Sequence, residues 1–97
     1  MLMHRQTRDI DTIIRRVIEI LPIVNVSQLK ATHPVDDDGI WYFFVQGDDQ
    51  DIQLESSLGM CPFIVETVEQ NSNRARTAET VENAVSMIVE YLSRRQA

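Results

Sequence analysis

The sequence contains few of the residues that build special turns or covalent links. It has one cysteine, Cys61, so no disulfide can form within the chain. Its three glycines, Gly39, Gly47 and Gly59, lie far apart, which excludes a glycine-rich phosphate loop and a dinucleotide-binding motif. The common nucleotide-binding and disulfide-linked frameworks are therefore not expected.

Long apolar runs are also missing. No stretch approaches the roughly 20 apolar residues needed to cross a bilayer, and the first residues lack the apolar core of a secretory signal. Together with the single cysteine, this indicates a cytoplasmic protein without a membrane partner.

Positive charge is absent from the middle of the chain. The net charge is −6, and residues 31–73 contain no lysine or arginine. The acidic residues of this stretch are Asp36, Asp37, Asp38, Asp48, Asp49, Asp51, Glu55, Glu66 and Glu69. A phosphate-binding surface needs clustered positive charge, so nucleic acid is not an expected partner. A basic protein would be attracted to this region; the alternative is that the acids only keep the domain in solution.

What the sequence does contain is typical of one globular domain spanning residues 1–97, with 43% hydrophobic and 25% charged residues. Apolar residues recur at helical spacing near both ends. The first stripe, which Pro22 ends, comprises Ile10, Ile13, Ile14, Val17, Ile18 and Leu21. The second stripe, with Thr77 or Thr80 as the expected N-cap, comprises Val81, Ala84, Val85, Ile88 and Leu92. These stripes predict two amphipathic helices.

Four strands are predicted between the helices. They cover residues 23–31, 40–45, 51–57 and 63–68, while the polar stretch 69–76 is expected to be a loop. The resulting order αββββα predicts an α+β fold, a four-stranded antiparallel meander with the N- and C-terminal helices packed on one face.

The second predicted strand is apolar on both faces. If two helices cover one side of the sheet, the aromatic residues of the other side remain exposed, and such patches commonly mark interfaces. The exposed set is either Trp41, Phe43 and Val45 or Ile40, Tyr42 and Phe44. An interface with a partner protein, a sheet-to-sheet homodimer, and cover by loops such as residues 69–76 are the alternatives.

Candidate catalytic groups are sparse. Cys61 lies in a Gly-x-Cys-Pro turn, but the only histidines are His4 and His33, so a structural cysteine is favoured over a nucleophile. Asp51 and Glu55 share one strand face, with Glu66 expected nearby, as solvent-facing residues of an antiparallel strand often do. The adjacent residues Asp36, Asp37 and Asp38 do not have the spacing of a calcium loop. No catalytic residue, metal or cofactor is predicted.

A longer pattern connects several of these segments. It comprises Asp51-Ile52-Gln53-Leu54-Glu55-Ser56-Ser57, then Gly59, then Cys61-Pro62-Phe63, preceded by Gly39-Ile40-Trp41-Tyr42-Phe43 and followed by Thr80-Val81-Glu82. This pattern resembles a family of small uncharacterised bacterial proteins. In general style it is also similar to the small acidic immunity proteins of bacterial toxin systems, a resemblance that implies neutralisation of a toxin by binding.

These observations predict a non-catalytic protein-binding module that uses an acidic, aromatic sheet surface, with immunity-type inhibition of a basic toxin as one version. The predicted contact residues are Trp41, Tyr42, Asp48, Asp49, Asp51, Gln53 and Glu55. The alternatives are a structural homo-oligomer and a small enzyme that uses Cys61.

Overall fold

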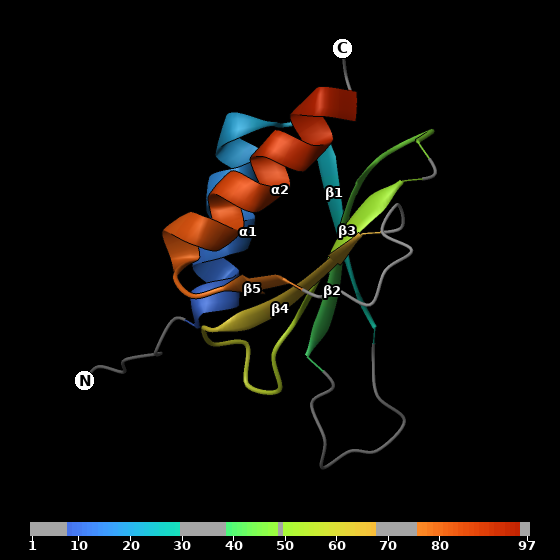
Figure 1. Ribbon diagram of the computed structural model, residues 1–97. Helices are drawn as coiled ribbons and strands as arrows, with labels where there is room; N and C mark the ends of the chain where they lie inside the picture. Colours follow the sequence, from blue (N-terminus) through green and yellow to red (C-terminus); the bar gives the residue numbers. More distant parts are fainter. Residues whose placement is uncertain (1–7, 30–38, 49, 68–75, 96–97) are drawn as a thin grey trace, which may run out of the picture.

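The computed structural model describes residues 8–29, 39–48, 50–67 and 76–95. It is an α+β structure in which two helices lie side by side against one face of an antiparallel sheet (Figure 1). The helices are α1 (Asp9–Ile20) and α2 (Val81–Arg95). The strands are β1 (Val24–Leu29), β2 (Ile40–Val45), β3 (Asp51–Glu55), β4 (Phe63–Thr67) and β5 (Arg76–Ala78).

Within the described residues the sheet has five strands, so the predicted number of four strands was too low by one. Its order is β1-β2-β3-β4-β5 with antiparallel neighbours, which confirms the meander. The additional strand, β5, pairs Ala78 with Phe63 and Thr77 with Ile64. Because β5 has only three residues and one buried side chain, its sequence shows no apolar–polar alternation from which a strand could be predicted.

The ends of both helices follow from local chemistry. At the start of α1, the backbone N–H of Arg8 donates to the carboxylate of Asp11 (3.2 Å). Pro22 follows Leu21, the C-cap of this helix, as predicted. At the start of α2, the hydroxyl of Thr80 accepts a hydrogen bond from the backbone N–H of Asn83 (3.1 Å), which confirms Thr80 as a cap.

The hydrophobic core lies between the helices and one face of the sheet, which we call the inner face. Strand pairing places Trp41, Phe43, Ile52 and Leu54 together on this face, and all four side chains are buried. The helices bury against them the residues Ile10, Ile13, Val17, Ala84, Val85, Ile88 and Leu92. Ile18, the outermost member of the first stripe, is exposed. Neither helix is long and apolar enough to cross a membrane, within the residues that the structure describes.

The N-terminal end of α1 is joined to the β3–β4 connection. The backbone N–H of Ile10 donates to the carbonyl oxygen of Gly59 (3.0 Å). The carboxylate of Asp9 accepts a hydrogen bond from the backbone N–H of Cys61 (2.8 Å). Both bonds satisfy polar groups that a helix start or a tight loop would otherwise leave unpaired. They fix the position of α1 along the sheet.

Candidate protein-binding surface

The face of the sheet opposite the helices, which we call the outer face, carries side chains from each of the five described strands. Residues that pair across antiparallel strands point to the same side of the sheet. The register therefore groups Tyr42 with Ser27 and Gln53, and Phe44 with Asn25 and Asp51. Ile40, Glu55, Ile64 and Glu66 also lie on the outer face, and the pairing of Ile64 with Thr77 extends it onto β5.

Aromatic side chains at the centre of this face remain partly exposed. Tyr42 and Phe44 are half-buried, whereas Phe43 between them is 0% exposed. Ile64 on β4 is 43% exposed. The alternating exposure along β2 decides between the two sets that the sequence left open: Ile40, Tyr42 and Phe44 face outward.

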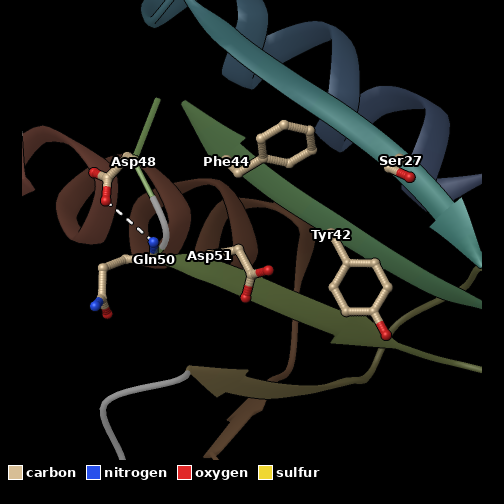
Figure 2. Close-up of a pocket in the computed structure, with 6 residues that line it drawn as sticks. All are labelled: Ser27, Tyr42, Phe44, Asp48, Gln50 and Asp51. Carbon is tan, nitrogen blue, oxygen red and sulfur yellow. Dashed lines mark hydrogen bonds between the residues drawn. The ribbon is translucent and has the colours of Figure 1, made fainter. Parts of the chain in front are cut away.

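A hollow of about 360 Å³ lies on the outer face near the β2–β3 turn. Tyr42 and Phe44 form its base, and Ser27 on β1 and Asp51 on β3 border it (Figure 2). Asp48 and Gln50 close the end towards the turn.

Hydrogen bonds hold the turn that closes the hollow. The carboxylate of Asp48 accepts a hydrogen bond from the backbone N–H of Gln50 (3.1 Å), as Figure 2 shows. The side-chain oxygen of Gln50 accepts one from the hydroxyl of Tyr91 on α2 (3.3 Å). These two bonds connect Gln50 to Asp48 within the turn and to Tyr91 of the helix layer.

The acids of the outer face differ in their environment. Burial raises the pKa of the Asp51 carboxyl above its usual value. On the neighbouring strand pair, the amide of Gln53 donates a hydrogen bond to the carboxylate of Glu66 (3.4 Å). Asp51 and Glu55 are both half-buried on this face, whereas Glu66 is exposed.

Of the predicted contact residues, Tyr42, Asp51, Gln53 and Glu55 lie together on the outer face. Asp48 lies at the rim of the hollow, and Asp49 lies outside the described residues.

Trp41, by contrast, points to the inner face and is only 3% exposed. Its ring meets that of Phe63 edge-on at 6.4 Å between centroids, and the guanidinium of Arg8 lies 5.8 Å from its centroid. The placement of Trp41 on the contact surface was therefore wrong, because alternation alone does not reveal which face the helices cover.

Ser27 and Gln50 were not among the residues predicted from the sequence, and Phe44 belonged only to one of two alternative sets. The alternation of Val24 and Val26 with polar residues was the available signal for Ser27, because it turns Asn25 and Ser27 to the same side as Tyr42. Gln50 lies in the turn, where periodicity gives no orientation.

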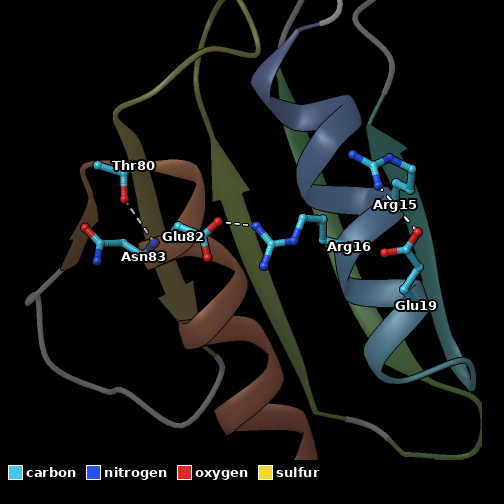
Figure 3. A network of polar contacts seen from close by, with 6 residues as sticks. All are labelled: Arg15, Arg16, Glu19, Thr80, Glu82 and Asn83. Carbon is cyan, nitrogen blue, oxygen red and sulfur yellow. Dashed lines mark hydrogen bonds and ion pairs between the residues drawn. The ribbon is translucent and has the colours of Figure 1, made fainter.

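Arginine side chains form their ion pairs in the helix layer. Within α1 and α2, Arg15 pairs with Glu19 (3.4 Å) and Arg94 with Glu90 (4.0 Å). Arg16 of α1 pairs with Glu82 of α2 and joins the two helices (Figure 3). This contact raises the pKa of Arg16 and lowers that of Glu82 through their hydrogen bond and opposite charges. These three ion pairs lie in the helix layer, on the side of the sheet away from the outer face.

Cys61 does not have the environment of a nucleophile. Its side chain is half-buried and packs against the core. Burial raises the pKa of the Cys61 thiol to about 11, and the hydrogen bond and negative charge of Asp9 add to the shift. At neutral pH the sulfur is therefore a thiol, whereas nucleophilic attack needs the thiolate.

Among the residues that the structure describes, no three acidic, histidine or cysteine side chains gather as metal ligands. His4, His33 and Asp36 to Asp38 lie outside them. The described residues form a small α+β domain whose sheet has one face covered by the helices. Residues 69–75, most of the loop that was predicted as a possible cover for the other face, lie outside the described residues. Comparison of the chain with protein-family models, curated proteins and solved structures finds no match.

Proposed function

We propose that this domain is a protein-binding module whose contact surface is the outer face of the sheet. The observation that carries the proposal is the partly exposed aromatic centre formed by Tyr42 and Phe44, bordered by the carboxylates of Asp51 and Glu55. Aromatic residues surrounded by a polar rim are typical of protein interfaces. A two-layer fold with both helices on the inner face leaves this surface to a partner.

The partner is a basic protein. Residues 31–73 supply acids and no lysine or arginine, so the outer face attracts positive charge. Immunity-type inhibition of a basic toxin is one form of this function and agrees with the resemblance noted in the sequence.

Charge also favours a foreign partner over a second copy. A symmetric sheet-to-sheet dimer would place the outer face of one copy, with Asp51, Glu55 and Glu66, against a second face that carries the same acids. Like charges that face one another in an interface oppose association. The raised pKa of the Cys61 thiol likewise argues against the enzyme alternative.

The test is affinity capture at low salt with three forms of the protein. One form is unaltered, one carries Tyr42→Ser and Phe44→Ser, and the control carries Ile20→Ser and Leu58→Ser, which change exposed apolar residues away from the outer face. Circular dichroism first establishes that all three are folded.

We expect a basic protein to be retained by the unaltered form and the control and to be lost with the outer-face variant. The same bound proteins with all three forms would contradict the proposal.

A further inference from the structure

The hollow on the outer face combines two aromatic rings with two carboxylates. Because Asp51 pairs with Phe44 across the β2–β3 ladder, its carboxylate lies beside the rings and not at a distant edge. Asp48 supplies a second carboxylate to the lining, at the end of the hollow near the β2–β3 turn. Rings attract cations over their faces, and carboxylates accept hydrogen bonds from them.

We propose that this hollow receives an arginine side chain of the partner protein, with the guanidinium stacked on Tyr42 or Phe44 and hydrogen-bonded to Asp51. This assignment rests on the proposed function and names the group that the outer face recognises. A guanidinium can contact both the rings and the carboxylates of the hollow. It is planar, stacks on aromatic faces and presents a fork of N–H donors that matches a carboxylate.

The size of the hollow suits one side chain. Pockets for small ligands range from roughly 300 to 1,000 Å³, and this one, at about 360 Å³, is near the lower limit. An extended arginine can enter it from a partner surface, whereas a large cofactor cannot be enclosed there.

Two further observations support a cation from outside the chain. Folding raises the pKa of Asp51 through burial, so the carboxylate loses hydration that an incoming guanidinium would replace with hydrogen bonds. Residues 31–73, which include most of the lining, contain no lysine or arginine.

The experiment is a titration of the isotope-labelled protein followed by NMR. The probe is a short glycine–serine peptide with one central arginine, compared with otherwise identical peptides that carry lysine or uncharged citrulline. We expect the arginine peptide to shift the amide signals of Ser27, Tyr42, Phe44 and Asp51. The lysine peptide should bind several-fold more weakly, and the citrulline peptide should bind at least about tenfold more weakly.

Protein variants locate the effect. Asp51→Asn should weaken binding of the arginine peptide about fivefold. The control is Glu66→Gln, which removes one negative charge from the same face but outside the hollow. It should change binding by less than about twofold, because solvent and salt screen a distant exposed charge.

Equal shifts with arginine and citrulline, or equal effects of the two variants, would overturn the assignment. Tighter binding of free L-arginine than of the peptide would assign the hollow to a small metabolite and would also overturn it. The proposed function is judged separately, by whether Tyr42→Ser and Phe44→Ser abolish capture of a basic protein. Arginine-peptide binding without such capture would leave the hollow intact and remove the proposed function.

Discussion

Gly39 and Gly47 show how differently one residue type can be constrained. Both have positive φ, at 62° and 89°. A side chain at Gly39 would meet the backbone oxygen of Ser56 at 1.8 Å, whereas nothing lies within 4 Å of a side chain at Gly47. The same pair of segments is joined by a hydrogen bond from the Ser56 N–H to the Gly39 carbonyl oxygen (2.9 Å). The entry into β2 therefore depends on the absence of a side chain at Gly39.

We expect Gly39→Ala to lower the free energy of unfolding by about 3 kcal/mol or more, because the strand entry must shift. Gly47→Ala should lower it by only about 1 kcal/mol, the conformational strain alone. Urea denaturation of both variants gives the comparison. Equal losses would mean that the β2 entry does not approach Ser56 as described.

The reactivity of the Cys61 thiol is a second property of a single residue that can be measured. With a pKa of about 11, it should react with iodoacetamide slowly at pH 7 and reach half of its maximal rate only near that pH. Asp9→Asn keeps a hydrogen-bond acceptor but removes a charge, so the midpoint should fall. A midpoint at or below the ordinary value of about 8.5 would restore the enzyme alternative.

The raised pKa of the Cys61 thiol also makes the stability of the fold depend on pH. The folded-state pKa of Cys61 lies above its unfolded value, so the protonated form is favoured by folding. Its contribution is fully present below about pH 8.5 and is lost as the pH rises towards 11.

Successive side chains of β2 alternate between the core and the outer face. Phe43 faces the helices and is fully buried, and its neighbour Phe44 faces outward beside the hollow. We expect Phe43→Ala to lower the free energy of unfolding by about 3–5 kcal/mol. Phe44→Ala should lower it by about 1 kcal/mol or less. Thermal or urea unfolding of the two variants measures the difference, and the reverse order would mean that β2 is turned over in the sheet.

The contact between Arg16 and Glu82 tests how the two helices meet. Folding lowers the pKa of Glu82, so the stabilisation is present above the unfolded pKa of about 4.3 and is lost as the pH falls through the folded value. In a double-mutant cycle of Arg16→Gln and Glu82→Gln, we expect favourable coupling at pH 7 that declines as the pH is lowered and as salt is raised to 1 M. The pair Arg15–Glu19, within one helix, is the control for coupling that does not depend on α1–α2 packing. Zero coupling between Arg16 and Glu82 at pH 7 and low salt would contradict their contact.

Most elements could be predicted from the sequence because their patterns are strong. The stripe that begins at Ile10 and the helix stop at Pro22 define α1, and β2 has the predicted bounds, Ile40–Val45. The strand β5 could not be predicted, because three residues are too few to show a period.

The candidate site was predicted in part for a related reason. The alternation of Asp51, Gln53 and Glu55 places these residues on one face, and the register brings them beside β2. Since β2 is apolar on both faces, only the position of the helices shows that Tyr42 is outside and Trp41 inside. The hydrogen bond from the backbone N–H of Cys61 to the carboxylate of Asp9 has no signal in the sequence, because 52 positions separate the two residues.

The distribution of charge over the molecule predicts its state of association. We expect the isolated protein to sediment as a monomer at low salt, because stacking two outer faces would bring carboxylates together. Sedimentation velocity over a range of concentrations makes the measurement. A dimer that Tyr42→Asp abolishes would instead favour the structural homo-oligomer. Trp41→Asp would be uninformative, because it introduces a charge into the core.

The arginine ion pairs and the acidic outer face lie on opposite sides of the sheet, so the charge of the described residues is distributed asymmetrically. A positively charged support, such as an anion-exchange resin, would capture it sheet-first and turn both helices towards the solvent. Diffusing near a basic partner, the domain would rotate into the same orientation before the first atomic contact. Productive collisions would then be a larger share of all collisions, and a few tenths molar of salt would return the approach to random orientation.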